Sequence, residues 1–288
     1  MSPESLDRIG VYSACLPGWS APRVIDVAVS LGFPTVEWAS GPGHAIRHPD
    51  AGPELRELCE LAGVKSTGVA VQDPDVTFAT PGFAAPHVAL AIELGAPQVR
   101  LLAPCYQGGA LAREQRRARA GVDLLVDLAA PAGVAVLVET SPATLAPGPD
   151  LAASLVEQHP PEHAGVLYDP GNMAIEGYLA PDLAIARLGR YLRHVHVKNI
   201  AWSHRGAEWR WRHATLATGV LDWHSIVHGL AAARYEGQFS IDHLGGDVSA
   251  AQLRSESAFL RTLVAEEFPL AAGVAAAPAA AEGGASRV

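Results

Sequence analysis

The feature that most constrains the fold of this chain is a regular alternation of short apolar runs with longer segments of helical period. Eight runs rich in Val, Ile and Leu have the length of β-strands: 8–14, 35–39, 64–71, 98–103, 134–140, 164–169, 194–199 and 239–244. The amphipathic segments between them, several of which end in glycine as helices do, include 22–32, 53–63, 87–95, 113–133 and 223–237. This alternation is typical of repeated βα units.

Strands that are joined by helices run parallel, and eight of them can close into a barrel with right-handed connections. We therefore predict an α/β fold, a single (β/α)₈ TIM barrel domain over 1–268. A doubly wound open sheet is the alternative, but no predicted strand is followed by the GxGxxG turn of a dinucleotide-binding sheet. The segment 269–288 is rich in Ala, Gly and Pro, and we expect it to be a disordered tail.

Charge and apolar patterning disfavour several classes of partner. The formal net charge of -9 disfavours nucleic acid and anionic membrane surfaces. Apolar stretches stop short of the roughly 20 residues that a spanning helix needs, and the N-terminus lacks a signal-peptide pattern, so we expect a cytoplasmic protein. Three widely spaced cysteines, Cys15, Cys59 and Cys105, indicate free thiols, not a disulfide framework.

The last four predicted strands carry ionisable residues at or near their carboxyl ends: Glu139, Asp169, His196 and Asp242. In an α/β barrel these ends meet at one mouth, where the chemistry takes place. Each residue alone could be a helix cap or half of an ion pair, but three carboxylates gathered at one mouth would repel one another. We predict that the four residues bind a divalent metal ion. His194 shares the face of His196 and could be the ligand instead.

The predicted ligand set is rich in oxygen and has one imidazole, which suits Mn²⁺ best, with Mg²⁺, Co²⁺ and Zn²⁺ as alternatives. Three negative ligands around a doubly charged ion leave a residual charge of about -1. We therefore expect a neutral polyol, sugar or hydroxyketone as the substrate. No phosphate-binding Gly-rich loop is evident, which favours an unphosphorylated one.

Other residues at the predicted mouth are candidates for substrate contact, with packing as the alternative for each. Trp19, Glu37 and Arg100 lie near the ends of the first four strands. Lys198 shares the face of His196 and could polarise a carbonyl or steady a carboxylate ligand. The segment 199–213, which contains Arg205, is dense in Trp and Arg and is expected to be a substrate lid or a subunit contact. A homo-oligomer or a partner subunit therefore remains open.

Several motifs together resemble the sugar phosphate isomerase/epimerase family, the xylose isomerase-like TIM barrels, over the chain up to about residue 265. They are VLVET with Glu139, LYDPGN with Asp169, HVHVKN with His196 and Lys198, and the closing run GVLDWHSIVHGL to YEGQFSIDH. The resemblance implies that Glu139, Asp169, His196 and Asp242 hold one divalent metal. It also implies an isomerase or epimerase in which Glu139 and Asp242 are the acid/base pair, moving a proton through an enediolate of a sugar, inositol or related hydroxyketone.

The chain departs from the family pattern at three positions. Asp242 stands where Glu is usual, Asn172 where many sugar epimerases have a substrate-binding His, and Asn199 where Asp is common. The shorter Asp242 requires a shifted strand or a role as ligand alone, unless His243 takes part. A changed acid/base residue keeps a metal-dependent lyase open, either a dehydratase or a C-glycoside-cleaving subunit. A DNA-repair endonuclease on a related barrel is disfavoured, because it needs a trinuclear zinc site and a basic face.

Overall fold

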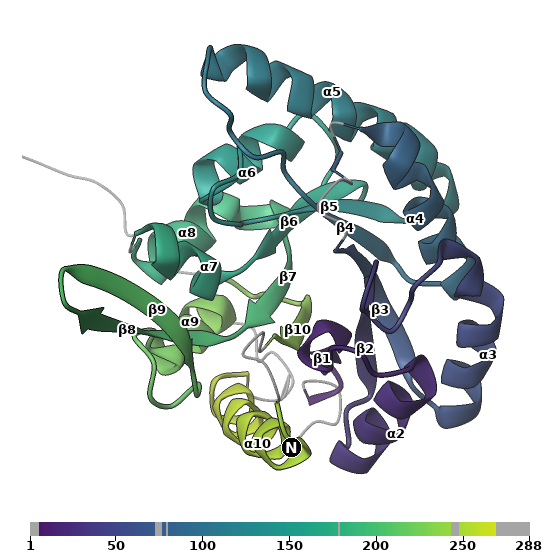
Figure 1. Ribbon diagram of the computed structural model, residues 1–288, viewed down its shortest axis with the longest axis vertical. Helices are drawn as coiled ribbons and strands as arrows, with labels where there is room; N and C mark the ends of the chain where they lie inside the picture. Colours follow the sequence, from purple (N-terminus) through teal and green to yellow (C-terminus); the bar gives the residue numbers. More distant parts are fainter. Residues whose placement is uncertain (1–5, 73–76, 79, 178, 243–247, 269–288) are drawn as a thin grey trace, which may run out of the picture.

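The computed structural model describes residues 6–72, 77–78, 80–177, 179–242 and 248–268. The predicted tail and His243 lie outside these residues. Eight parallel strands close into a barrel in the order β1-β10-β7-β6-β5-β4-β3-β2 (Figure 1). The strands are β1 Ile9–Tyr12, β2 Thr35–Ser40, β3 Lys65–Val71, β4 Gln98–Leu102, β5 Ala135–Glu139, β6 Ala164–Tyr168, β7 Leu192–Val197 and β10 Gln238–Ile241. The predicted barrel is confirmed, and the open sheet is excluded.

A ring of helices surrounds the barrel (Figure 1). The helices are α2 Ala21–Leu31, α3 Gly52–Ala62, α4 Pro81–Leu94, α5 Leu111–Ala129, α6 Pro149–Val156, α7 Pro170–Glu176, α8 Pro181–Leu188, α9 Trp223–Ala232 and α10 Ala250–Glu267. The prediction that helices end at glycines is confirmed for α2, α3 and α4. Their C-caps are Gly32, Gly63 and Gly95, each with a positive φ. The strands are buried on both faces, which explains why they read as apolar runs.

The strand register places the predicted ligands at one end of the barrel. Glu139 is the last residue of β5, and Asp169 directly follows β6. On β7, His196 pairs with Ser240 of β10, and the backbone N–H of Asp242 donates to the Val197 carbonyl at 3.0 Å. All of these positions lie at the carboxyl ends of their strands. The closed barrel therefore brings them to the same mouth.

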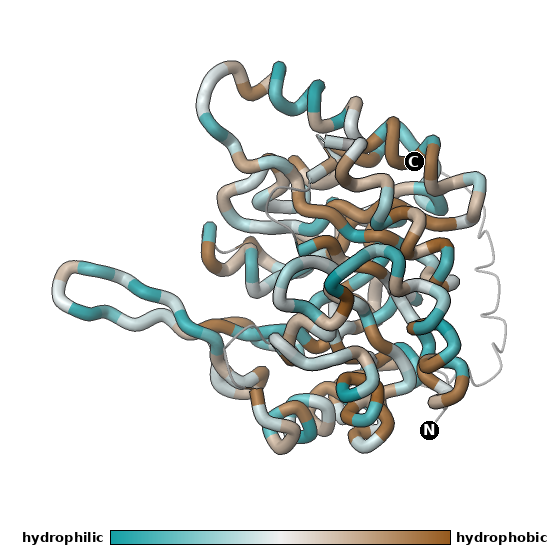
Figure 2. Tube along the Cα trace, turned by 45° about the vertical axis from the view of Figure 1, so that its right-hand side comes forward, coloured by the Kyte–Doolittle hydropathy of each residue, from teal (hydrophilic) through white to brown (hydrophobic). Residues whose placement is uncertain are grey.

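The segment after β7 leaves the barrel as an antiparallel hairpin of β8 Asn199–Arg205 and β9 Glu208–Ala214. The two strands form a separate two-stranded sheet, which projects from the body of the molecule (Figures 1 and 2). This is the segment in which the sequence predicts a lid or a subunit contact.

Within the described ranges, the structure contains no helix whose length and apolar character would let it cross a bilayer.

Candidate metal centre

The imidazole of His196 stands among three carboxylates at the mouth. Its Nδ1 lies 3.6 Å from Oε1 of Glu139, 3.6 Å from Oδ2 of Asp169 and 3.4 Å from Oδ2 of Asp242. All four side chains are buried. The barrel thus brings together the four residues that the sequence names as metal ligands.

This arrangement fits a metal ion on two grounds. Potential ligand atoms of Glu139, Asp169 and His196 all lie within 4.8 Å of one another, a group that does not include Asp242. In the described part of the chain, His196 Nδ1 and Asp242 Oδ1 are buried without a hydrogen-bond partner. A buried polar atom left without a partner is costly, and a divalent cation among these atoms would remove that cost.

Glu37 fixes the orientation of His196 from behind. Its Oε2 lies 2.8 Å from His196 Nε2, which turns Nδ1 toward the three carboxylates. The sequence predicts substrate contact for Glu37, but its carboxylate is 1% exposed and is engaged by the His196 and His194 imidazoles. That prediction is not supported by the placement, and the residue instead acts on His196.

His194, the alternative ligand on β7, has partners at both ring nitrogens. Nδ1 lies 2.5 Å from Gln98 Nε2, and Nε2 lies 2.7 Å from Ser240 Oγ. Glu37, His194 and His196 are also close enough to hold an ion. Because His194 is already hydrogen-bonded on both sides, the group of Glu139, Asp169 and His196 is the better metal site.

Each carboxylate at the mouth also has a cationic or amide partner. Lys198 Nζ lies 2.7 Å from both Asp169 Oδ2 and Asp242 Oδ2. Arg100 Nε lies 3.0 Å from Glu139 Oε2, and Asn172 Nδ2 donates to Glu139 Oε1 at 2.9 Å. The carboxylates are therefore held in position before any metal binds.

A glycine in the DPGN motif makes room for Lys198. A Cβ on Gly171 would stand 2.5 Å from Lys198 Cγ, so any larger residue would push the lysine stem away. In the same motif, the backbone N–H of Asn172 donates to Asp169 Oδ1 at 2.8 Å, which makes Asp169 the N-cap of α7. The motif thus places both Lys198 and Asp169.

Burial and charge act in opposite directions on these groups. Burial alone would raise the pKa of Glu139, but the Arg100 charge outweighs burial and the pKa is lowered. Burial would likewise raise the pKa of Asp242, but the Lys198 charge outweighs it and the pKa is lowered. Burial raises the pKa of Asp169 despite Lys198. Burial alone would lower the pKa of His196, but Glu37 and the three carboxylates raise it well above its usual range.

The formal charges of the buried cluster leave room for a divalent cation. Among the buried residues that the structure describes, the four carboxylates of Glu37, Glu139, Asp169 and Asp242 face two permanent cations, Arg100 and Lys198, so the formal balance is -2 before His196 is counted. A proton on His196 offsets part of this charge in the metal-free protein, and a doubly charged ion would offset all of it.

Comparison with known proteins identifies the family of this chain. The model of the family described as the xylose isomerase-like TIM barrel matches residues 25–263. The chain belongs to the xylose isomerase-like TIM barrel family. No curated protein matches it in sequence.

Solved structures share the fold of this xylose isomerase-like barrel at low sequence identity. A D-tagatose 3-epimerase-like protein is 17% identical, with 91% of this chain and 98% of that chain covered and a TM-score of 0.74. A xylose isomerase-like TIM barrel protein from Mycobacterium smegmatis, in complex with magnesium, is 17% identical, with 91% and 98% covered and a TM-score of 0.70. The probable 3-DHS dehydratase AsbF of Bacillus anthracis is 16% identical, with 88% and 98% covered and a TM-score of 0.70.

Two predicted contact residues do not join the metal group of this xylose isomerase-like barrel. Arg205 is exposed at the far end of β8, where it pairs in register with Glu208. Trp19 packs partly buried against the core, with the Arg23 guanidinium 3.7 Å from its ring centroid. A seven-residue strand carries Arg205 outward, and core packing holds Trp19. Substrate contact by either residue stays a prediction.

The xylose isomerase-like barrel also contains contacts that the sequence does not predict. Tyr12 stacks on His196 with ring centroids 4.9 Å apart and accepts a hydrogen bond from Arg100 Nη2 at 2.6 Å. Thr140 Oγ1 accepts from the Asp169 backbone N–H at 2.8 Å. The partners of His194 could have been found from strand periodicity, since Gln98 and Ser240 stand two residues before Arg100 and Asp242 on the same strand faces.

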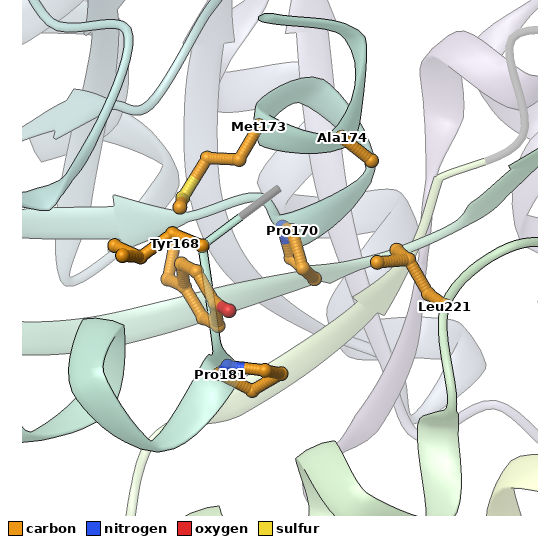
Figure 3. Close-up of a pocket in the computed structure, with 7 residues that line it drawn as sticks. Tyr168, Pro170, Met173, Ala174, Pro181 and Leu221 are labelled. Carbon is orange, nitrogen blue, oxygen red and sulfur yellow. The ribbon is translucent and has the colours of Figure 1, made fainter. Parts of the chain in front are cut away.

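A small apolar cavity near β6 is separate from the metal group of this xylose isomerase-like barrel. Its lining includes Tyr168, Pro170, Met173, Pro181 and Leu221 (Figure 3). Its volume of about 10 Å³ is at the lower limit for one water molecule. This cavity is far too small for a sugar.

Proposed function

We propose that this protein is a divalent-metal-dependent isomerase or epimerase that acts on a sugar, inositol or related hydroxyketone without a phosphate group. The observation that carries the proposal is the convergence of Glu139, Asp169 and His196 around the unpartnered Nδ1 of His196. The epimerase-like structural neighbour supports it.

Glu139, Asp169, His196 and Asp242 would hold the metal, with Mn²⁺ as the proposed ion and Mg²⁺, Co²⁺ and Zn²⁺ as alternatives. When bound, such an ion supplies Lewis acidity that makes a hydrogen next to a carbonyl more acidic. The neighbour in complex with magnesium supports a divalent ion in this fold.

Glu139 and Asp242 are the proposed acid/base pair. Glu139 is kept ionised by Arg100 and oriented by Asn172, so it can accept a proton from the substrate carbon. The electron pair of the broken C–H bond passes to the carbonyl oxygen and gives an enediolate. Asp242 takes a proton from the Lys198 ammonium, 2.7 Å from its Oδ2, and delivers that proton to the opposite face of the carbon, which inverts it. Lys198, beside Asp242, is placed to steady the developing negative charge.

A lyase is the second candidate, and the Asp242–Lys198 pair favours it. Asp242 Oδ2 is 2.7 Å from Lys198 Nζ, so its carboxylate is already tied to a cation. With Glu139 as the base, the Lys198 ammonium could instead protonate a leaving hydroxyl on the neighbouring carbon, so that water is lost. The dehydratase among the structural neighbours supports this alternative.

The metal is tested first. The purified protein should contain about one divalent ion per chain, and His196→Ala should lose most of it while remaining folded by circular dichroism. A matched control is Trp19→Phe, which alters the predicted mouth away from the metal group and should retain the ion. Full metal content in His196→Ala would contradict the proposed ligand set.

The reaction class is tested in D₂O with Mn²⁺ and a panel of ketoses, inosones and glycosides. An isomerase or epimerase incorporates deuterium at carbon without loss of water or aglycone. Asp242→Asn should then reduce turnover by about 10²-fold or more, the typical contribution of a general acid or base. Release of water or aglycone would support the lyase, and full turnover of Asp242→Asn would remove the second base.

A further inference from the structure

The β8–β9 hairpin has two chemically distinct faces. Opposite residues in an antiparallel pair point to the same side of the sheet. One face therefore carries the pairs Trp202–Trp211 and His204–Trp209, and the other carries Ala201–Arg212, Ser203–Arg210 and Arg205–Glu208. The indole side is open to solvent, with Trp202, Trp209 and Trp211 exposed by 38%, 68% and 42%. An isolated two-stranded sheet is marginally stable in water. Exposed aromatic side chains and unpaired strand edges favour binding of another chain to it.

The two strand edges differ in their surroundings. β8 packs against α7 near its buried first residues, Asn199 and Ile200. β9 is exposed from Glu208 to Arg212, and its strand partner is β8. The outer edge of β9 is thus the more accessible place for a further strand.

We propose that β9 pairs with the β9 strand of a second copy of this chain, antiparallel and centred on Arg210. A two-fold axis at Arg210 places Glu208 opposite Arg212 of the partner subunit, and Trp209 opposite Trp211 of the partner subunit. The result is a four-stranded sheet across the two copies. This pairing is isologous, as in most homodimers.

Charge complementarity specifies this register. Glu208 already holds the Arg210 guanidinium of its own strand, at 3.1 Å from Nε and 2.6 Å from Nη2. Among the described residues, Arg212 donates to the His213 carbonyl at 3.3 Å and has no carboxylate partner. Pairing about Arg210 gives Arg212 such a partner in the other copy. On the axis itself Arg210 lies opposite Arg210 of the partner subunit, where each guanidinium is held by its own Glu208. Pairing about Trp211 would instead set Arg210 against Arg212 twice and give Arg212 no carboxylate partner, so it is the more repulsive register.

The same register extends the aromatic face. Across the four strands it aligns Trp202 and Trp211 of one copy with the Trp209 and His204 positions of the other. Within one hairpin, His204 and Trp209 already lie with ring centroids 5.1 Å apart. The pairing therefore joins two short aromatic rows into two longer ones and covers Trp209, the most exposed indole of the three.

The charge pair is tested by exchange, with the dimer dissociation constant measured by sedimentation velocity. Glu208→Arg and Arg212→Glu should each weaken the dimer at least tenfold, and the double exchange should return it to within about threefold of wild type. Arg254→Glu on α10 is the matched control and should change nothing. A monomeric wild-type protein at 100 µM, or a double exchange as weak as the single ones, overturns the proposal.

The two-fold axis is tested by cross-linking. In a Cys105→Ser background, which removes the exposed thiol, Arg210→Cys should form an intermolecular disulfide on mild oxidation, because residues opposite each other in adjacent strands have Cα atoms about 4.5–5.5 Å apart. Ser203→Cys, one strand farther from the axis, should not. Equal cross-linking of both variants, or none of Arg210→Cys, overturns the register. Neither experiment depends on metal or turnover, so its outcome is independent of the proposed activity.

Discussion

Glu37 determines which nitrogen of His196 faces the carboxylates. Because its Oε2 lies 2.8 Å from Nε2, the other nitrogen is left to face a metal ion. Glu37→Gln should therefore weaken binding of Mn²⁺ roughly 10–100-fold, the usual cost of losing such an outer partner, as measured by calorimetric titration. Ser240→Ala, which removes a partner of His194 alone, is the matched control. Wild-type affinity in Glu37→Gln would show that His196 needs no such support.

Glu256 offers a test of burial on a carboxyl group outside the site. Burial raises its pKa, although the Leu216 backbone N–H, 2.9 Å from Oε2, opposes this. Because the pKa in the folded state exceeds that in the unfolded state, the folded protein binds more protons between the two values, and stability falls as pH rises through that window.

Glu256→Gln keeps the acceptor and removes the charge, so it should stabilise the protein at pH 7 by about 1 kcal/mol or less. The gain should shrink toward pH 4, where the wild-type carboxyl is protonated in both states. Urea unfolding of both proteins at the two pH values measures the difference. An equal gain at both pH values would show that the pKa of Glu256 is not raised by folding.

At the scale of residues, the sequence predicts which side chains meet but not what each one touches. Glu139, Asp169 and His196 could be named because parallel strands share one carboxyl edge. The place of Glu37 behind His196 spans the barrel from β2 to β7, a relation that strand periodicity does not encode. Arg205 follows Lys198 closely in the sequence, but β8 carries it away from the ligands, and the sequence does not predict that this strand projects.

At the scale of elements, Asn199 ties the hairpin to the loop that follows it. Its Nδ2 donates to the carbonyls of Leu216 and Leu221, and its Oδ1 accepts from the Leu221 backbone N–H. This loop passes close by, since a Cβ on Gly219 would stand 2.0 Å from Asn199 Cγ. An Asp at this position would put a carboxylate against two carbonyl oxygens, whereas the Asn amide donates to both.

Asn199→Asp should accordingly destabilise the protein by about 1–3 kcal/mol at neutral pH, because two buried carbonyls lose their hydrogen-bond donor. Urea denaturation measures this. Gln107→Glu makes the same chemical change on an exposed loop and should stay within about 0.5 kcal/mol of wild type. If Asn199→Asp lowered the free energy of unfolding no more than Gln107→Glu does, Asn199 would not be needed to hold this loop.

The sequence predicts the barrel strands better than it predicts the hairpin. The eight strands could be predicted because burial on both faces makes each one a compact apolar run between helices. The hairpin was not, because its alternation is of Trp with Arg, and neither side is covered by the core. Tertiary burial, which marks the barrel strands in the sequence, is absent from a sheet that extends into solvent.

At the scale of the whole molecule, one ion at the mouth would link β5, β6, β7 and β10, strands spread over residues 135–241. The unfolded chain cannot hold these ligands together, so binding favours the folded state by about 2.7 kcal/mol at a free ion concentration of 100 Kd. For a protein near this size that corresponds to a rise in Tm of roughly 5–10 °C. Scanning calorimetry with Mn²⁺, and then with excess chelator, measures it. His196→Ala should abolish the rise, whereas Glu208→Arg on the hairpin should keep it. A rise that survives in His196→Ala would place the ion elsewhere, and the carboxylates at the mouth would then be balanced by Lys198 and Arg100 without an ion.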